Sequence, residues 1–362
     1  MVLVWRSGPI PEALAKEIRR LPGVAVATVV ASGTLWLDRT LSPDGSVVSR
    51  ASHGFAIPLD VAALDPSAYA AVVDTPTRAF ASDLRRGAIL SETSAAIRDA
   101  RRGTRLVLSH SVVAVASVAP DVAVGAHEVV VSRQAGAALG VTEPSYLVAR
   151  LWPQADPRAA AASIRRSAGA SLRVRVRSAA QTPYLRQADG VLPPEWEKVY
   201  FGEFAARPQG DGSFQLDPAW VREHVRTARV PVLGTVRCNR ALLGPLRSAL
   251  GSLQESGLGS LVHRSEYGGC FAPRAIRGGS SLSHHSWGSA IDVNVSTNGL
   301  GQRPHQDPRL VRAFERAGFV WGGRFLRPDG MHFEFGCPEH FPMAKTVHIP
   351  QGLMKLPLCL GG

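Results

Sequence analysis

The sequence has no long uninterrupted apolar run. No stretch reaches the roughly 18 consecutive apolar residues expected of a membrane-spanning helix, and the best candidate, residues 23–37, is interrupted by Ser and Thr. The opening Met-Val-Leu-Val-Trp-Arg is too short for the apolar core of a signal peptide, and no small-residue cleavage site follows it. We therefore expect any export signal or membrane anchor to lie outside this sequence.

Lysine is scarce, and arginine carries most of the basic charge. Only four of the 41 basic residues are Lys, and the 29 acidic residues leave a formal net charge of +12. Such a charge attracts anionic polymers, including nucleic acid, membrane surfaces and an acidic cell wall. The basic residues lack the clusters interleaved with aromatic residues that a nucleic-acid groove needs, so we expect no nucleic-acid partner.

Cysteine is rare, and no C-x-x-C pair is present. The four cysteines all lie in the C-terminal half, which favours two disulfides over a redox motif or a structural zinc site. Of the three possible connectivities, the local one pairs Cys238 with Cys270 and Cys337 with Cys359. Four buried free thiols are the alternative.

A chain of 362 residues has room for two domains. Residues 1–180 alternate Val-rich runs with short helical patterns, which predicts a mixed α/β domain. The polar, Pro-bearing residues 181–198 predict a linker, and residues 199–362 form the second domain of an α+β protein. The expected N-terminal elements are helices at 11–21 and 78–86 and strands at 25–30, 34–37, 106–118 and 128–131.

The N-terminal half offers no catalytic pattern. His127 and Glu128 begin like a zincin motif, but the second His of H-E-x-x-H is missing, so this pair is interpreted as part of a strand. His53 and His110 stand alone, and a metal site needs three or four converging ligands. We expect hydrogen-bonded structural roles for both.

Two stretches of this half resemble the extracytoplasmic core domain of MacB/FtsX-type permeases. They are Gly-Ala-Ile-Leu-Ser-Glu at 87–92 and Pro-Asp-Val-Ala-Val-Gly at 120–125. The resemblance implies a domain outside the membrane and no catalysis. It also implies a membrane anchor or membrane partner acting through a segment that is not in this chain.

The helices of the C-terminal half are marked by their ends. Asp217 before Pro218 and Asp307 before Pro308 predict two helix starts, because Asp caps the first turn and Pro suits its first position. Five leucines between 242 and 253 recur at helical spacing and predict a buried helix face.

The stretch 283–292 reads Ser-His-His-Ser-Trp-Gly-Ser-Ala-Ile-Asp and places His285 seven residues before Asp292. Polar and apolar residues alternate over 290–295, which predicts a strand with Asp292 and Asn294 opposite its aliphatic face. Small residues before this strand would let the loop that carries His285 fold back against it.

Residues 329–335, Asp-Gly-Met-His-Phe-Glu-Phe, alternate in the same way and place His332 and Glu334 on one strand face. His285, Asp292 and His332 together offer two imidazoles and one carboxylate. Three such ligands, with a fourth position left for water, are what a catalytic zinc requires. We predict a site for one Zn²⁺ ion.

A water molecule on such a metal needs a base. Asp329, three residues before the second histidine, is the predicted catalytic base, and Glu334 is the competitor that better suits the orientation of a ligand. Arg274 is predicted to stabilise an oxyanion or a substrate carboxylate, with Arg277 in reserve.

Other polar residues near the motifs receive supporting roles. Ser283 is expected to fix the loop that carries His285, which we call the motif loop. Trp287 is expected to be either part of the core or a wall of the substrate cleft. The remaining histidines of this half are expected at the surface or beside ligands: His284, His305, His340 and His348.

Four separated stretches resemble, in the same order, the VanY-like family of zinc D-Ala-D-Ala carboxypeptidases and L-alanyl-D-glutamate endopeptidases. They are residues 269–274, 282–285, 321–323 and 329–334. The resemblance implies the small α+β fold shared by DD-peptidases and the Hedgehog signalling domain. It also implies zinc ligands and a base at the four positions His285, Asp292, His332 and Asp329.

One feature of that family is missing. Its members carry the assisting Arg in a Tyr-Arg motif further upstream, and here only His263, Arg264 and Tyr267 occupy that region. The assignment of Arg274 therefore depends on its position alone.

These features predict a zinc metallopeptidase that hydrolyses a peptide bond next to a D-amino acid in peptidoglycan stem peptides. It would act outside the cytoplasm, in the cell envelope or secreted, as a D-Ala-D-Ala carboxypeptidase or an L-Ala-D-Glu endopeptidase. A serine mechanism is disfavoured, because no S-x-x-K or G-x-S-x-G motif is present. The alternative is a catalytically inactive cell-wall-binding or permease-associated module.

Overall fold

The computed structural model is α+β and divides into two compact units. The first contains Met1–Leu185, Pro193–Glu195 and Arg277–Ser281, and the second contains Arg186–Leu192, Trp196–Ile276 and Leu282–Gly362. The residues described are 1–6, 8, 10–52, 54–73, 76–109, 111–125, 127–167, 172–177, 190–209, 213–276 and 281–336, with the backbone of 346–349 and 352–355. His53, His110, Arg277, His340, Cys337, Cys359 and residues 181–189 lie outside them.

A ten-stranded sheet forms the frame of the N-terminal unit. Its strands are β1 (Val2–Trp5), β2 (Val24–Leu41), β3 (Val47–Arg50), β4 (Ile57–Leu64), β5 (Ala88–Ser91), β6 (Arg105–Leu108), β7 (Ser111–Ala119), β8 (Val129–Ser132), β9 (Pro144–Leu151) and β10 (Arg173–Val176). Their order is β10-β1-β9-β2-β4-β8-β5-β7-β6, with β3 attached to β2. A further pairing of β2 with β6 joins the end of this order back to the longest strand.

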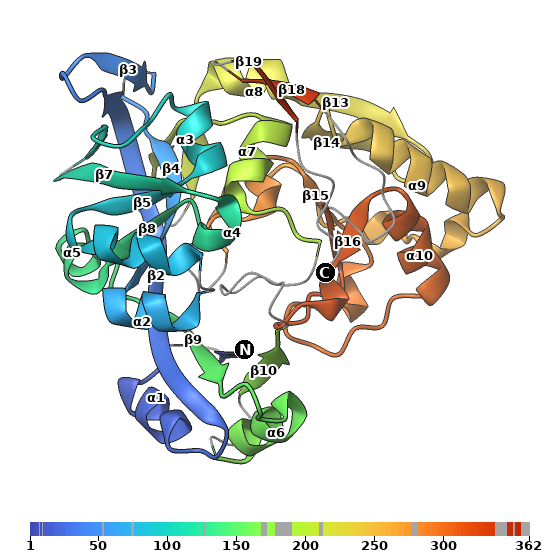
Figure 1. Ribbon diagram of the computed structural model, residues 1–362. Coiled ribbons are helices and arrows are strands. Elements are labelled where there is room, and N and C mark those ends of the chain that lie inside the picture. Colours follow the sequence, from blue (N-terminus) through green and yellow to red (C-terminus); the bar gives the residue numbers. More distant parts are fainter. Residues whose placement is uncertain are drawn as a thin grey trace. The chain divides into compact units, whose positions relative to one another are not determined.

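Strand β2 runs the length of this unit (Figure 1). The sequence predicted two strands, at 25–30 and 34–37, and this was wrong because Gly33 continues the ladder opposite Val61 of β4. The reverse holds for residues 106–118, which form the antiparallel pair β6 and β7 instead of one strand. The partner strands decide both outcomes: β2 continues through Gly33 because it pairs with β4, and residues 106–118 divide because β6 and β7 pair with each other.

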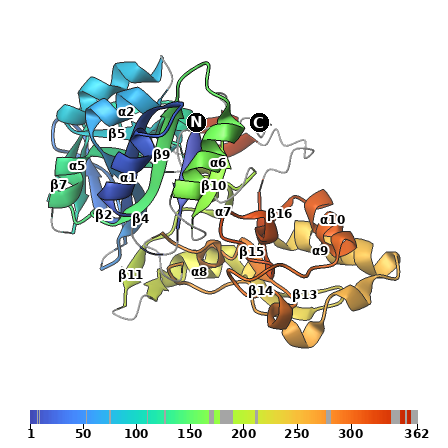
Figure 2. The same ribbon diagram turned by 90° about the horizontal axis from the view of Figure 1, so that it is seen from below.

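Short helices pack on this sheet (Figure 2). They are α1 (Glu12–Arg19), α2 (Pro66–Val72), α3 (Glu92–Ile97), α4 (Asp121–Val124), α5 (Arg133–Ala138), α6 (Pro157–Ser167) and the 3-10 helix η1 (Thr77–Arg85). Helices α1 and η1 lie where the sequence predicted helices. Ile18 of α1 and Tyr69 of α2 are fully buried against the strands.

The pair His127 and Glu128 is part of a buried polar network at the start of β8. His127 Nδ1 contacts Asp60, and its Nε2 lies 3.0 Å from the Tyr146 hydroxyl. Glu128 Oε1 lies 2.9 Å from Nη2 of Arg98, and both side chains are almost fully buried. These hydrogen bonds give the pair a structural role. The two residues lie in a bend directly before β8 and not within the strand that the sequence predicted.

The C-terminal unit combines helices with small sheets. Its elements are α7 (Pro194–Phe201), β11 (Ala206–Pro208), β12 (Phe214–Leu216), α8 (Pro218–His224), β13 (Val225–Val230), β14 (Gly234–Asn239), α9 (Leu243–Glu255), β15 (Ala290–Asp292), α10 (Pro308–Arg316), β16 (Phe319–Trp321), β17 (His332–Phe335), β18 (Thr346–Ile349) and β19 (Gly352–Lys355). Five 3-10 turns, η2 to η6, connect them, at Gly259–Leu261, Arg264–Glu266, His284–Ser286, Val295–Thr297 and Gly322–Arg324. The order β15-β17-β16 forms an antiparallel sheet, and β11–β12, β13–β14 and β18–β19 form hairpins.

Local sequence signals fix several of these elements. Asp217 and Asp307 accept backbone N–H groups at the starts of α8 and α10, each with Pro in the first turn, as predicted. The leucine face of α9 is buried. Cys238 and Cys270 form a disulfide with Cα atoms 5.4 Å apart, as the local pairing predicted. No helix among the described residues is long and apolar enough to cross a membrane.

Candidate metal centre

Two antiparallel strands position the second half of the candidate site. Asp292 of β15 lies directly opposite His332 of β17, and Ala290 lies opposite Glu334. Directly opposed residues project from the same face of an antiparallel pair, so the carboxylate and the imidazole meet. Strand pairing thus brings together two groups that are 40 residues apart in the sequence.

The strand predicted over 290–295 is shorter than expected and ends at Asp292. Asn294 adopts a left-handed conformation with a φ of 55°, which a continuing strand does not allow. Its side chain accepts the His263 N–H and donates to the Leu261 carbonyl, at 2.8 and 2.9 Å. These bonds offset the backbone strain and end β15 directly after the carboxylate.

A 3-10 turn, η4 (His284–Ser286), carries the first histidine. Ser283 caps this turn and accepts the His285 N–H at 3.4 Å. Gly288 follows with a φ of 68°, and a Cβ atom there would lie 2.7 Å from the Asn239 nitrogen. Only glycine therefore lets this loop pack so closely against the end of β14.

His285, Asp292 and His332 converge on one point. Nε2 of His285 and Nδ1 of His332 are 3.2 Å apart, and Asp292 Oδ1 lies 3.2 Å from the former and 3.1 Å from the latter. Zinc–ligand distances of about 2.0 Å in a tetrahedral site separate neighbouring ligand atoms by about 3.3 Å. The donor set and its spacing therefore fit a zinc ion.

Each imidazole is oriented by a hydrogen bond on its other nitrogen. His285 Nδ1 donates to the Cys270 carbonyl at 2.8 Å, and His332 Nε2 donates to Glu334 Oε2 at 2.9 Å. With a metal ion bound, these bonds would leave the lone pairs of His285 Nε2 and His332 Nδ1 for the ion, as metal-ligating histidines require. Without an ion, the same two nitrogens lie within hydrogen-bond distance of Asp292 Oδ1.

The electrostatics of the cluster favour a bound cation. All three side chains are buried. Burial alone would raise the pKa of Asp292, but hydrogen bonds from His285 and His332 hold it well below its usual range. Burial alone would lower the pKa of His332, but bonds to Asp292 and Glu334 raise it well above 6.5. The site therefore keeps a buried negative charge that a proton or a metal ion balances.

Asp329 lies at the turn that enters β17. Its N–H donates to the Gly322 carbonyl at 2.8 Å, and its own carbonyl accepts the His332 N–H at 3.2 Å. Burial raises the pKa of its carboxyl. The charge of His332 offsets part of this rise, and the nearby carboxylates of Asp292 and Glu334 add to it. Its Oδ1 is buried without a hydrogen-bond partner among the described residues. An oxygen with these properties suits proton transfer.

Arg274 lies on a segment bound to the motif loop. Its carbonyl accepts Ser283 N–H at 3.1 Å and Ser286 Oγ–H at 3.0 Å. Its side chain is exposed, and its guanidinium forms no ion pair within the described ranges. The backbone is thus fixed beside the site while the charged group is available.

Trp287 belongs to the core of the unit and does not line an open cleft. Only 4% of its surface is exposed, and its ring centroid lies 4.6 Å from that of Phe204. His305 is exposed and takes no part in the His285–Asp292–His332 group.

Sequence reasoning missed Glu197, which supports the site, whereas it expected His284 at the surface or beside the ligands. Glu197 of α7 is fully buried, accepts the Ser289 hydroxyl and has a pKa raised by burial to about 7. His284 Nδ1 lies 3.2 Å from Glu334 Oε2 and 4.0 Å from Glu197 Oε2. Glu197 lies far before the motifs, and no local pattern distinguishes it from other acidic residues in a helix.

The family comparison covers this site. Residues 277–335 match a family model described as D-alanyl-D-alanine carboxypeptidase. This stretch is therefore similar to a family of peptidases. It contains the three clustered residues together with Asp329 and Glu334, and it begins just after Arg274. No curated protein matches the chain.

Solved structures similar to this chain cover its N-terminal half and are permease domains. The periplasmic region of MacB from Actinobacillus actinomycetemcomitans is 8% identical, covers 48% of this chain and 87% of its own, and gives a TM-score of 0.35. The extracellular domain of the ABC-type transporter YknZ from Gram-positive bacteria is 14% identical, covers 48% of this chain and 99% of its own, and gives a TM-score of 0.32. A domain of a permease protein from Porphyromonas gingivalis is 14% identical, covers 48% of this chain and 85% of its own, and gives a TM-score of 0.28.

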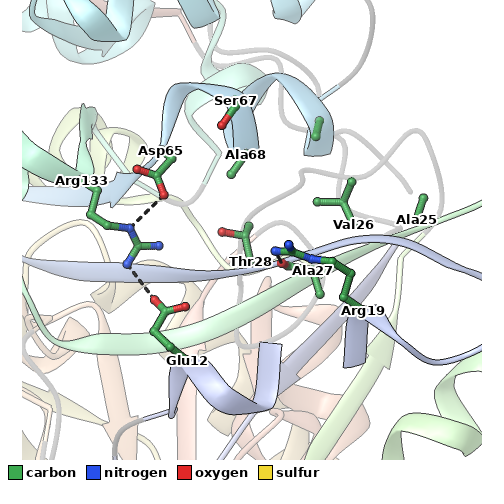
Figure 3. A pocket seen from close by; sticks show the side chains of 11 residues that line it. Glu12, Arg19, Ala25, Val26, Ala27, Thr28, Asp65, Ser67, Ala68 and Arg133 are labelled. Carbon is green, nitrogen blue, oxygen red and sulfur yellow. Dashed lines mark hydrogen bonds and ion pairs between the residues drawn. The ribbon is translucent and has the colours of Figure 1, made fainter. Parts of the chain in front are cut away.

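The N-terminal unit contains a hollow of about 520 Å³ between α1, β2 and α2 (Figure 3). Arg133 lies at one side of it and binds Glu12 at 2.9 Å and Asp65 at 3.2 Å. Arg19 donates to the Ala27 carbonyl at 2.9 Å. Because these charged groups are already paired, we assign the hollow no chemical role.

Proposed function

We propose that the C-terminal unit is a zinc metallopeptidase that hydrolyses a peptide bond next to a D-amino acid in peptidoglycan stem peptides. The observation that carries this proposal is the triangle of donor atoms from His285, Asp292 and His332, with sides of 3.1 to 3.2 Å. The family match over residues 277–335 supports the peptidase part of the proposal.

When bound, zinc would act as a Lewis acid toward a substrate carbonyl and would make a water molecule more acidic. His285 and His332 would hold it through Nε2 and Nδ1, and Asp292 through Oδ1. Cys270 and Glu334 would keep the two rings in the required tautomers through the hydrogen bonds already described.

Asp329 would accept the proton of the attacking water and return it to the leaving amine. The pKa of its carboxyl is raised toward neutral pH, and a general base works most effectively when its pKa lies near the operating pH. Arg274 would supply the positive charge for an oxyanion or for a substrate carboxylate, and its fixed backbone limits how far that charge can move.

We also propose that the protein acts outside the cytoplasm on the cell wall. The disulfide between Cys238 and Cys270 supports this, because disulfides persist in oxidising compartments. The net charge of +12 would favour an anionic wall polymer. The N-terminal unit would bind a membrane partner, or be attached to a membrane anchor, through a segment outside this chain.

The test combines metal analysis with mass spectrometry of purified muropeptides. Wild type should contain about one zinc per chain and cleave the stem peptide, whereas Asp329→Ala should keep zinc and lose cleavage. Release of D-Ala alone would assign a carboxypeptidase, and cleavage after L-Ala an endopeptidase. Intact muropeptides with zinc-loaded wild type would overturn the catalytic proposal and favour a binding module.

A further inference from the structure

We propose that residues 268–272, fastened by the Cys238–Cys270 disulfide, form a brace that sets two of the three metal ligands in place. The inference rests on the proposed metal centre and adds positioning residues to it. The brace is defined here as Gly268-Gly269-Cys270-Phe271-Ala272.

On one side the brace binds both ligand-bearing segments. Gly268 N–H donates to the Asp292 carbonyl at 2.9 Å, and Asp292 N–H donates to the Gly269 carbonyl at 3.0 Å. Ala272 N–H donates to the His285 carbonyl at 2.9 Å. The Cys270 carbonyl accepts His285 Nδ1–H at 2.8 Å. Backbone and ring of one ligand, and the backbone of another, are thus fixed by five consecutive residues.

On its other side the brace is attached to β14. The Cys270 side chain is bonded to Cys238, and both residues are buried. Phe271 N–H donates to the Arg237 carbonyl at 3.0 Å, and the Arg237 guanidinium lies 4.7 Å from the Phe271 ring centre. The covalent bond is therefore in the same residue whose carbonyl orients His285.

The brace also approaches Asp292 too closely for a side chain. A Cβ atom on Gly268 would lie 2.9 Å from Asp292 Cβ and 2.6 Å from Val295 Cγ1. Real Cβ atoms do not tolerate such distances, so the side chain of any other residue would displace either the brace or β15. The position of the brace and that of Asp292 are therefore coupled sterically as well as by hydrogen bonds.

Loss of a hydrogen-bond partner that orients a metal ligand typically costs 10–100-fold in metal affinity. Without the disulfide, only the backbone hydrogen bonds of the brace would hold the Cys270 carbonyl, and the His285 ring would sample more orientations that do not bind the metal. The brace therefore acts through the ligands and does not touch the metal or the substrate.

The test compares full-length Cys238→Ala/Cys270→Ala with Leu250→Ala, a core change in α9 at a fully buried position. Zinc affinity is measured by chelator competition at a temperature where circular dichroism shows both metal-free proteins folded. The cobalt-substituted absorption spectrum reports ligand geometry. The double variant should bind zinc about 10–100-fold more weakly and show an altered cobalt spectrum. Leu250→Ala should lower the melting temperature and leave affinity and spectrum unchanged.

Gly268→Ala is the second variant, because it keeps the disulfide and should still weaken zinc binding if the double variant fails to fold. The brace proposal would be overturned if the double variant and Gly268→Ala bound zinc as tightly as wild type, or if Leu250→Ala lost as much zinc affinity as they do. Either result would leave the metallopeptidase proposal intact. A wild-type protein that binds no zinc would overturn both.

Discussion

Asp292 and His332 occupy directly opposed positions on β15 and β17, and their side chains meet at 3.1 Å between Oδ1 and Nδ1. The pair joins two motifs that are far apart in the chain, and His285 completes the triangle from a separate turn. The opposite nitrogen of His332 is bound to Glu334 from the same strand. One two-residue step along β17 thus provides a ligand and the group that orients it.

His332→Ala is expected to abolish stoichiometric zinc binding, because it leaves only two donors of a three-ligand site. His305→Ala, at an exposed histidine outside the cluster, is the matched control and should retain the metal. Elemental analysis after gel filtration measures both. Equal zinc content in the two variants would show that the triangle is not the site.

Glu334→Gln should bind zinc more weakly, by about 10–100-fold, since a neutral amide orients and polarises the His332 ring less well than a carboxylate. Asp329→Asn should instead keep its zinc affinity and lose activity by about 10²–10⁴-fold. Zinc titration and muropeptide turnover of the two variants separate these roles. The opposite pattern would exchange the assignments of base and orienting group.

Glu197 is expected to make the metal-free protein less stable as the pH rises. Its native pKa of about 7 lies above the ordinary value of 4.5 for a glutamate, so the folded state binds the proton more tightly than the unfolded state. This contribution is complete below pH 4.5 and is lost as the pH rises to about 7, with a loss on the order of 3 kcal/mol.

Glu197→Gln removes that ionisation, so its free energy of unfolding should change less than that of wild type between pH 4.5 and 7. Urea denaturation of both proteins in the presence of a chelator measures the difference at each pH. Parallel profiles for the two proteins would show that Glu197 ionises normally in the folded state.

Gly288→Ala should destabilise the protein by more than about 1 kcal/mol, because its φ of 68° and the nearby Asn239 nitrogen leave no room for a Cβ atom. Gly251 in α9 has nothing within 4 Å of its would-be Cβ, so Gly251→Ala should stabilise by about 0.5–1 kcal/mol. Thermal denaturation of the two variants tests the contrast. A stable Gly288→Ala protein would mean that the motif loop can move away from β14.

The sequence by itself determined which donor groups the candidate site contains and part of its local structure. The alternation in residues 329–335 placed His332 and Glu334 on one face of a strand, and that strand is β17. Asp307 and Pro308 marked the start of α10. Such features are encoded within a few residues, because backbone periodicity and helix capping are local properties.

Only the tertiary structure decided which groups complete the site. The register that opposes Asp292 to His332 depends on pairing between distant strands, and β15 ends where Asn294 binds the backbone of a remote turn. The group that orients His285 is the carbonyl of Cys270, and every residue has a carbonyl, so no side-chain pattern indicates it. Long-range packing selects one such group out of many, and that selection is made by contacts between residues that are distant in the chain.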